Sequence, residues 1–504
     1  MGKETELKFE VAPHHLAKLR TAPVLRRRPQ KEEDLLSVYF DTPKHELAKN
    51  NVTLRVRHNG DKRFQTVKSA GSTFKRGEWE HEVEGEFPNL RKTRDSPFAP
   101  MVSKKLKRQL RPIFETQIHR TIVPVNRNGS HIQVALDEGR VRAGRKSVPI
   151  VEVELELKRG QASEAFELAR KLSQVVPAKL ALKSKAERGY DLINHKPHRA
   201  VYAEEILLHR GMPIADAFRT IGRSILRHIA ANEVAVVTAD SEGIHQMRVG
   251  LRRLRAAISL FGPLLGDKQT ERLKSELRWL TGKLASARDL DVYLKSEIQP
   301  LRAAAPAKRG MREFEEVIAS RRLAAFRKAR AAVASQRYRS LLLDTLQWIE
   351  DGDWARHSGR RSHRRIEEFA VAVLSWRTKE VSKNATRLRR LDPRRRHKLR
   401  IAVKKLRYAG DFFGCLFNGR KARKRLSRFE LHLKNLQDDL GALNDITVHQ
   451  KLAPKLASEK PRTTIRQRAA AALVSGHEQS AIQPLLRAAD KDARRLTTVR
   501  AFWA

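Results

Sequence analysis

The stretch Val151-Glu152-Val153-Glu154-Leu155-Glu156-Leu157-Lys158 alternates strictly between apolar and charged side chains. Successive residues of a β-strand point to opposite faces, so this pattern predicts a strand with one apolar and one charged face. The same alternation occurs at residues 4–11, 54–57 and 78–84. Turn signals such as Asn59-Gly60-Asp61 separate the runs by a few residues, which favours antiparallel connections. The first 190 residues are therefore expected to form an antiparallel β-structure.

The polar face of several of these runs carries dense charge of both signs. Such a face fits a closed barrel with a charged lumen, whose apolar outer face would be covered by helices at residues 12–21 and 161–175. An ordinary sheet with a solvated charged face fits the alternation equally well. The pattern alone leaves both arrangements open.

Beyond about residue 200 the period changes from two to about 3.6 residues, with leucine and alanine at helical spacing. Helices are expected near residues 204–231, 241–262, 268–296, 311–335, 362–380, 394–416, 421–440 and 462–498. Residues 193–203, a short polar segment with a proline, are the expected linker between a domain at 1–192 and an all-helical domain at 204–500. The sequence thus predicts an α+β protein with two domains.

The helical half contains an internal repeat. Residues 245–255, beginning at a histidine, align without gaps on residues 397–407, and residues 280–289 align on 436–445. Self-similarity of this kind predicts two related helical bundles, at about 204–350 and 360–500.

The bulk composition indicates a polyanion as partner. Among 504 residues, Lys and Arg number 104 and Asp and Glu 57, which leaves a formal net charge of +47. A field of this sign attracts nucleic acid, inorganic polyphosphate or an anionic membrane surface, although a general basic bias would give the same number. Cys415 is the single cysteine, and neither a signal peptide nor a membrane-spanning apolar run is recognisable. We expect a cytoplasmic protein without a membrane partner.

The N-terminal strand carries Glu4, Glu6 and Lys8 on one face, an E-x-E-x-K pattern. Two carboxylates at this spacing can bind a hard divalent cation, and the lysine can hold a phosphate oxygen beside it. Other strands repeat the combination, with Arg55 and Arg57 on one face and several glutamates on another. Opposite charges of this kind suit phosphoanhydride hydrolysis, or they neutralise one another in a structural ladder.

These motifs, in this order, resemble the CYTH domain, the triphosphate tunnel metalloenzyme family, over residues 3–190. The similarity rests on Glu4-Thr-Glu6-Leu-Lys8, Leu54-Arg-Val-Arg57, Thr66-Val-Lys68, Arg76-Gly-Glu78-Trp-Glu80, Phe114-Glu-Thr116 before Arg120, Asp137-Glu-Gly139, Glu152 to Lys158, and Ser184 to Tyr190. It implies an eight-stranded antiparallel tunnel and metal-dependent hydrolysis of inorganic triphosphate to diphosphate and phosphate, with Mg²⁺ or Mn²⁺. Thiamine triphosphate or ATP as substrate is the alternative within the family.

The resemblance also implies roles for individual residues. Triphosphate would be bound by Lys8, Arg55, Arg57, Lys68, Arg76, Arg120 and Lys185. Glu4, Glu6 and Glu154 would bind the metal that organises the phosphates, and Asp137 and Glu152 would help to bind a second metal that activates water. With Lys8, these five acidic residues make up the expected catalytic set.

In the helical half, positions i, i+3, i+7 and i+10 of a helix form one stripe. The stripe holds His245, Arg248, Arg252 and Arg255 in the first repeat and His397, Arg400, Lys404 and Arg407 in the second, with Arg253 and Lys405 widening it. A charged stripe on one helix is usually a solvated face. Because the same stripe recurs, we expect two ridges that form a long basic groove for a flexible polyanion.

This half resembles the CHAD family, a helical domain named for its conserved histidines, over about residues 205–500. The resemblance implies non-catalytic binding of inorganic polyphosphate and location on polyphosphate granules, with Arg288 and Lys434 as further contacts. A protein that only binds polyphosphate is one alternative. A specific nucleic-acid partner is disfavoured, because aromatic residues make up only 6% of the chain and no reading motif is present.

Overall fold

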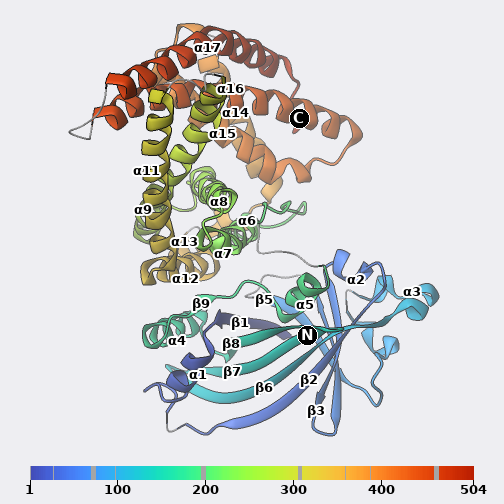
Figure 1. The fold of residues 1–504 in the computed structure, drawn as a ribbon. Coiled ribbons are helices and arrows are strands. Elements are labelled where there is room, and N and C mark those ends of the chain that lie inside the picture. The colour runs from blue at the N-terminus through green and yellow to red at the C-terminus, as the bar shows by residue number, and fades with distance from the viewer. Residues whose placement is uncertain are drawn as a thin grey trace. The chain divides into compact units, whose positions relative to one another are not determined.

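The structure, a computed structural model, describes residues 2–26, 28–69, 75–96, 98–194, 200–304, 309–357, 359–385, 388–458 and 465–504. It divides into two compact units, residues 1–199 with 339–347 and residues 200–338 with 348–504. The first unit contains the β-sheet and the second is helical (Figure 1). Part of the expected linker at 193–203, residues 195–199, lies outside the described residues.

The β-sheet closes on itself. Its strands are β1 (Gly2–Glu10), β2 (Lys31–Asp41), β3 (Val52–Asn59), β4 (Lys62–Ser69), β5 (Lys75–Glu82), β6 (Arg111–Arg127), β7 (Ser130–Ala143), β8 (Lys146–Arg159) and β9 (Lys179–Leu180). The order is β5-β4-β3-β2-β6-β7-β8-β1-β9, and an additional pairing of β5 with β1 completes a ring of eight antiparallel strands. This ring is the eight-stranded tunnel expected from the sequence. The sheet has nine strands because the two-residue β9 also pairs with β1.

Alternation along the strands separates the two faces of the barrel. On β1, Leu7 and Phe9 are buried on the outside, where β1 and β8 contact α4 (Ala162–Val175). Helix α1 (Pro13–Arg20) packs against α4, so both expected covering helices form. The remaining short elements are α2 (Glu46–Lys49), η1 (Leu90–Thr93), η2 (Ala99–Met101), α3 (Lys104–Gln109) and α5 (Lys185–Ile193). The closed, helix-covered barrel is therefore correct, and the open sheet is not.

The second unit consists of helices. They are α6 (Ile214–Ala231), α7 (Glu233–Val237), α8 (Ser241–Leu260), α9 (Lys268–Tyr293), η3 (Leu294–Ile298), α10 (Gln299–Ala304), α11 (Arg309–Ala334), α12 (Gln336–Asp351), α13 (Asp353–His357), η4 (Gly359–His363), α14 (Ile366–Ala385), η5 (Leu388–Arg390), α15 (Pro393–Phe413), η6 (Gly414–Leu416), α16 (Arg420–Ser458) and α17 (Ile465–Thr498). Three expectations need correction. Helix α16 continues to Ser458, well beyond the expected end at 440. Helix α6 begins at Ile214 rather than at 204, because Pro213 disfavours a helical residue before it, and α12 was not anticipated.

The sequence repeat corresponds to repeated helices. Its first block lies on α8 and α15, which pack against each other, and its second block lies on α9 and α16. On α8 the apolar stripe Met247, Leu251, Leu254 and Ile258 is buried, as its spacing predicts. Within the part of the chain that the structure describes, no helix combines the length and the apolar character needed to cross a bilayer.

Candidate active site and basic cluster

Strand register brings the charged residues of β1 and β8 together inside the barrel. Lys8 lies opposite Glu154, and Glu6 lies opposite Glu156. Lys8 Nζ donates a hydrogen bond to Glu154 Oε1 over 2.6 Å and lies 3.2 Å from Glu6 Oε1. All three side chains of this contact are at least nine-tenths buried. The E-x-E-x-K pattern thus faces the lumen.

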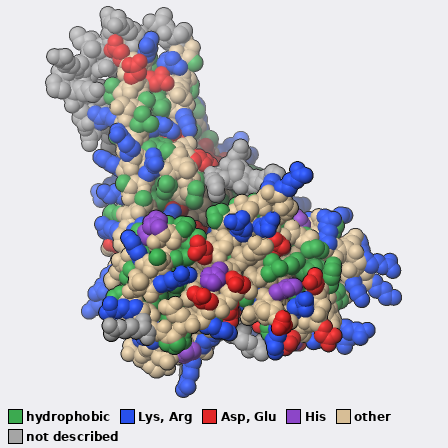
Figure 2. Space-filling model, turned by 60° about the horizontal axis from the view of Figure 1, so that its bottom comes forward, with side chains coloured by type: hydrophobic (Ala, Val, Ile, Leu, Met, Phe, Trp, Pro, Cys, Tyr) green, Lys and Arg blue, Asp and Glu red, His purple; other side chains and the backbone are tan. Residues whose placement is uncertain are grey.

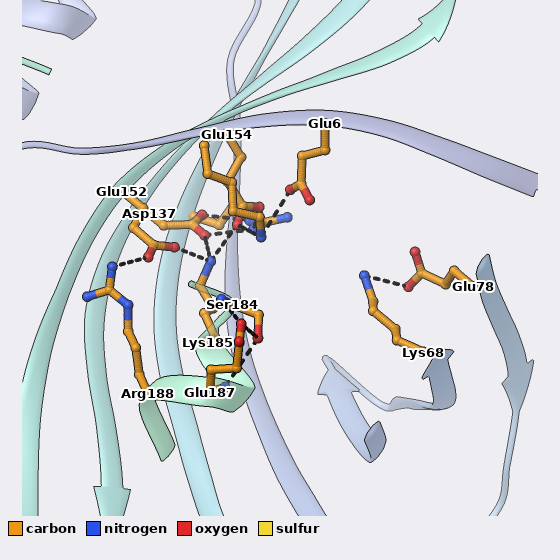
Figure 3. Close-up of polar contacts among 12 residues, drawn as sticks. Glu6, Lys68, Glu78, Asp137, Glu152, Glu154, Ser184, Lys185, Glu187 and Arg188 are labelled. Carbon is orange, nitrogen blue, oxygen red and sulfur yellow. Dashed lines mark hydrogen bonds and ion pairs between the residues drawn. The ribbon is translucent and has the colours of Figure 1, made fainter. Parts of the chain in front are cut away.

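Lys185 lies among the buried carboxylates of Asp137, Glu152 and Glu154, which we call the acidic wall (Figure 3). Its Nζ lies 2.6 Å from a carboxylate oxygen of Glu154, 2.8 Å from one of Asp137 and 2.9 Å from one of Glu152. A capping box fixes this position: the Ser184 hydroxyl accepts from the Glu187 amide, and the Glu187 carboxylate accepts from the Ser184 amide. Lys185 is the first residue of α5, so the cap aims it into the barrel.

Arg120 and Arg188 complete the acidic wall. Arg120 lies opposite Asp137 across β6 and β7, and its Nε and Nη2 each donate to one oxygen of that carboxylate over 2.7 Å. The same guanidinium reaches Glu154 Oε2 at 2.5 Å. Arg188, one turn beyond Lys185 on α5, lies 2.8 Å from Glu152 Oε1. Gly139 allows β7 to approach β6 here, because a Cβ at this position would lie 1.9 Å from the Gln117 carbonyl oxygen.

The wall formed by β3, β4 and β5 pairs a lysine and two arginines with glutamates of β5. Lys68 Nζ lies 3.1 Å from Glu78 Oε1, and Arg55 Nη2 lies 3.8 Å from the same oxygen. Arg57 Nη2 lies 3.7 Å from Glu80 Oε2. Figure 3 shows Lys68 and Glu78 across an open space from Glu6 and the cluster around Lys185. Cations thus line this side of the barrel, opposite the buried carboxylates.

Between the two walls lies a cavity of about 240 Å³. Charged and hydroxyl side chains line it, and they are Glu6, Lys8, Ser37, Tyr39, Thr53, Arg55, Arg57, Thr66, Lys68, Glu78, Glu80, Thr116, Arg120, Glu154, Glu156, Lys158, Ser184 and Lys185. Asp137 and Glu152 do not line it and have no exposed surface. They lie behind Arg120 and Lys185 and hold those cations in place.

Sequence reasoning missed two contributors to this site. Tyr39 lies opposite Arg55 in the β2–β3 register and lines the cavity. Burial alone would raise the pKa of Tyr39, but the guanidinium of Arg55 outweighs it and lowers that pKa. Arg188 lies within the motif from Ser184 to Tyr190, but no role was predicted for it. Its spacing of three residues from Lys185 on a short helix places both side chains on one face.

Electrostatics explain how the acidic wall stays charged. Burial by itself would raise the pKa of Glu154, but Lys185, Lys8 and Arg120 outweigh it and hold this pKa well below its usual range. Burial likewise opposes the charge on Lys185, and the carboxylates of Asp137, Glu152 and Glu154 raise its pKa well above the usual value. Each group is stable as an ion only because its partners are present.

The donor set fits a hard divalent cation. Carboxylate oxygens of Asp137, Glu152 and Glu154 all lie within 4.8 Å of one another, and Glu6 and Glu154 face the cavity. Such oxygens are the ligands that Mg²⁺ and Mn²⁺ prefer. The side chains of Glu4 and Arg76 lie outside the described residues; the backbones of these two residues pair across β1 and β5. The metal and triphosphate roles of individual residues stay predictions.

In the helical unit, charges from both repeats converge on one cluster. We call Arg248, Arg252, Arg288, Arg400, Lys404 and His245 the basic cluster. Arg248 and Arg252 on α8 act electrostatically on Lys404 of α15, and Arg252 acts on Arg400. Asp289 and Asp445, the repeated aspartates, are nearby counter-charges, and Arg248 Nη2 lies 3.4 Å from Asp289 Oδ1. Glu242 also acts on His245, and Arg288 Nη1 lies 3.6 Å from Asp291 Oδ2. Positive charges therefore outnumber negative ones.

Burial and the neighbouring positive charges lower the pKa values of two members of the basic cluster. Burial, with Arg400 and Arg252 beside it, lowers the pKa of Lys404 to about 7. Burial and the neighbouring Arg288 lower the pKa of His245 to about 4, so this imidazole is neutral at physiological pH. An anion bound between these groups would relieve both shifts.

The other stripe residues lie around the cluster. Arg253 is buried with its guanidinium 5.7 Å from the Phe412 ring, and Asp411 is an electrostatic partner of both Arg253 and Arg407. Lys405 is influenced by Arg377, Glu380 and Arg255, and Arg255 itself is exposed. His397 Nδ1 lies 2.7 Å from Asn444 Oδ1, and Lys434 is exposed on α16. The structure thus brings six of the twelve expected polyphosphate contacts into one cluster.

Basic side chains are not confined to that cluster. Figure 2 shows Lys and Arg side chains spread over the whole visible face, with acidic side chains between them. Positive charge is therefore also present on this surface, and the basic cluster is distinguished by its burial.

Comparison with known proteins divides the chain in the same way. Residues 2–190 match the CYTH domain, and residues 220–454 match the CHAD domain. An inorganic triphosphatase of Haemophilus influenzae is 34% identical over 160 residues, 31% of this chain and 44% of that protein. An uncharacterized protein of Mycobacterium tuberculosis is 26% identical over 367 residues, 68% of this chain and 69% of that protein. The crystal structure of the CHAD domain from the plant Ricinus communis aligns with a TM-score of 0.52 and 29% identity, over 60% of this chain and 99% of that domain.

Proposed function

Since the chain carries a CYTH domain followed by a CHAD domain, we propose that it hydrolyses inorganic triphosphate in the tunnel and binds inorganic polyphosphate at the basic cluster. The observation that carries the first part is the two-walled cavity, with a carboxylate held ionised by buried cations on one side and Arg55, Arg57 and Lys68 on the other. The similarity to the triphosphatase of Haemophilus influenzae supports it and spans less than half of that protein.

The basic residues on the two sides of the cavity would bind different parts of the triphosphate. Arg55, Arg57 and Lys68 would exchange contacts with Glu78 and Glu80 for phosphate oxygens. Lys8, Arg120 and Lys185 would face the opposite end of the triphosphate. Fixed donors of this kind stabilise charge that develops on transferring phosphoryl oxygens without reorganising during the reaction.

Glu6 and Glu154 would hold a Mg²⁺ or Mn²⁺ ion at the cavity surface. When bound, the ion supplies a positive charge that neutralises phosphate oxygens and lowers the pKa of a coordinated water. Asp137 and Glu152 keep Arg120 and Lys185 charged and oriented. Their part in a second metal site remains a sequence prediction.

The test is phosphate release from inorganic triphosphate with Mg²⁺ or Mn²⁺, beside ATP, thiamine triphosphate and long-chain polyphosphate. We expect release from triphosphate, and a loss of roughly 10²- to 10³-fold in Glu6→Gln. Glu138→Gln is the control, because Glu138 is adjacent to Asp137 in sequence but exposed on the outside of β7. No release from any substrate by folded protein would contradict the enzyme and favour a protein that only binds polyphosphate.

Polyphosphate binding is supported by the excess of buried positive charge at the basic cluster. A flexible polymer of phosphates supplies many negative charges without a fixed shape, which suits a cluster built from two pseudo-equivalent helices. Competition between polyphosphate and DNA at several salt concentrations tests this part. Equal affinity for both would overturn polyphosphate specificity. Location on polyphosphate granules follows only if binding is specific.

A further inference from the structure

A second group of metal-binding side chains lies in the helical unit. It consists of Glu297 on η3, His449 on α16 and Glu478 on α17, and one ligand atom of each lies within 4.8 Å of the others. His449 and Glu478 are 4% and 3% exposed, and Glu297 is half-buried. None of the three belongs to the basic stripes or to the tunnel.

One buried carboxylate oxygen of this group has no hydrogen-bond partner among the described residues. Glu478 Oε1 lies 2.5 Å from His449 Nδ1, but the buried Glu478 Oε2 has no hydrogen-bond partner among the described residues. Burying a carboxylate oxygen without a partner is costly, so such an oxygen in a core calls for a ligand.

Tyr293 gives a second, independent indication. It is fully buried, its ring centroid lies 4.4 Å from that of His449, and its hydroxyl has no hydrogen-bond partner among the described residues. The charges of Glu478 and Glu297 act on this hydroxyl, so it lies near the same group. A buried hydroxyl beside two carboxylates would ordinarily donate to one of them, and here it does not.

The backbone is also irregular at this place. Helix α9 ends at Tyr293 and continues as the π-helical turn Leu294–Ile298, which carries Glu297. Wide turns of this type are rare and are frequent at functional sites, because they re-aim a side chain at the expense of regular hydrogen bonding. The turn brings Glu297 to the two long helices, although it is distant from both in sequence.

We propose that Glu297, His449 and Glu478 bind a Zn²⁺ ion that fastens η3 to α16 and α17. One imidazole nitrogen and two carboxylate oxygens are a known Zn²⁺ donor set, and water would take the fourth position. Mg²⁺ is disfavoured because it selects oxygen ligands over imidazole. The ion would take the place of the direct contact between His449 Nδ1 and Glu478 Oε1.

A matched control lies on the same two helices. His432 of α16 pairs with Asp492 of α17, Nδ1 to Oδ1 over 3.0 Å, and no third ligand completes a metal-binding group around it among the described residues. His432→Ala therefore removes a histidine–carboxylate pair between the same helices without removing a metal ligand.

The experiment loads the untagged full chain with Zn²⁺, removes loose metal by gel filtration, and measures bound zinc together with X-ray absorption. We expect imidazole scattering from one histidine, and the loss of about one equivalent of zinc in His449→Ala but not in His432→Ala. The tunnel cavity is lined by oxygen and lysine or arginine groups, so zinc held there would show no imidazole. The absence of an imidazole signal from wild-type protein would overturn the proposal, as would equal zinc loss in both variants.

The outcome of the zinc experiment does not depend on whether the chain hydrolyses triphosphate. A chain that hydrolyses triphosphate but binds no imidazole-ligated zinc contradicts only the zinc site. If His449→Ala fails to fold, Glu478→Gln removes one ligand with little change of shape, and the wild-type absorption spectrum still decides.

Discussion

The tunnel and the basic cluster treat buried cations in opposite ways. In the tunnel, Lys185 is surrounded by three carboxylates, which raise its pKa. In the basic cluster, Lys404 lies among arginines and has a pKa of about 7. The first arrangement is a network of buried ion pairs, whose charges are compensated without a ligand. The second is a strained concentration of like charge that an anion would relieve.

This difference separates two kinds of phosphate chemistry. A reaction needs charges fixed within a fraction of an ångström, and paired ions at register-matched strand positions supply that. Binding of a long flexible polymer needs only excess charge, and its affinity depends on salt. Three sets of substitutions and one change of pH test this difference.

The largest effect is expected from Lys185→Met. Removing this ammonium leaves Asp137, Glu152 and Glu154 buried without their shared partner. Breaking a buried ion network in this way costs about 3–5 kcal/mol. We expect the unfolding transition of the CYTH unit to move to lower temperature in calorimetry of the full chain, and Lys183→Met, at an exposed pair with Asp191, to leave it within error. An unshifted transition in Lys185→Met would mean that the acidic wall does not depend on the lysine.

The next effect concerns affinity. In Arg252→Gln/Arg400→Gln, the basic cluster loses one guanidinium from each repeat, and polyphosphate affinity should fall about 100-fold, at roughly tenfold for each lost charge-assisted contact. The salt dependence of binding should become shallower at the same time. Triphosphate hydrolysis should be unchanged.

Arg312→Gln/Arg356→Gln is the control for that pair. Both arginines are exposed and pair with acidic side chains on their own helices, so the control removes the same net charge without touching the cluster. Equal loss of affinity in the two double variants would show that overall charge, and not the cluster, binds the polymer.

A smaller effect is expected from pH. Lys404 has a pKa of about 7 in the free protein, and a bound polyanion would raise it, so binding takes up a proton above pH 7. Polyphosphate affinity should therefore fall as pH rises from 7 to 9, by at most about tenfold for each pH unit. Isothermal calorimetry in buffers with different ionisation enthalpies measures the proton uptake directly. Lys404→Arg should flatten the profile, and an identical slope in that variant would assign the proton to another group.

Alternation and register explain how much of the tunnel could be predicted. The charged face of residues 151–158 and of β1 is visible in the sequence, and antiparallel pairing then places Lys8 beside Glu154. The central position of Lys185 could not be foreseen in this way. It comes from a helix, and its direction depends on the Ser184 cap. Likewise, only the packing shows that Asp137 and Glu152 lie behind the cavity wall.

In the helical unit, the repeat predicted two basic stripes, and the packing of α8 on α15 determined which of their residues meet. Stripe position alone does not distinguish Arg252, which acts on Arg400 within the basic cluster, from Arg253, which is buried against Phe412 of the same helix α15. The group of Glu297, His449 and Glu478 has no sequence signature, since its ligands are separated along the chain and one is carried by an irregular turn. Residue spacing predicts which side chains share a face of one helix or strand. Which faces of different elements contact each other is known only from the folded structure.

The smallest effect has the opposite sign to the first. Folding lowers the pKa of Lys404 from 10.5 to about 7, so the unfolded chain binds more protons between these values and the folded state is penalised by the charge below them. Lys404→Met removes the penalty and keeps a stem of similar length, so the CHAD unit should gain on the order of 1 kcal/mol at pH 7 while polyphosphate binding weakens. The gain should shrink as pH rises toward 10, because the lysine of the unfolded chain then also begins to lose its proton and burying it in the neutral form costs less. The two methionine substitutions, compared by calorimetry across pH, decide whether the units differ as described: destabilisation by Lys404→Met would mean that its charge is compensated like that of Lys185.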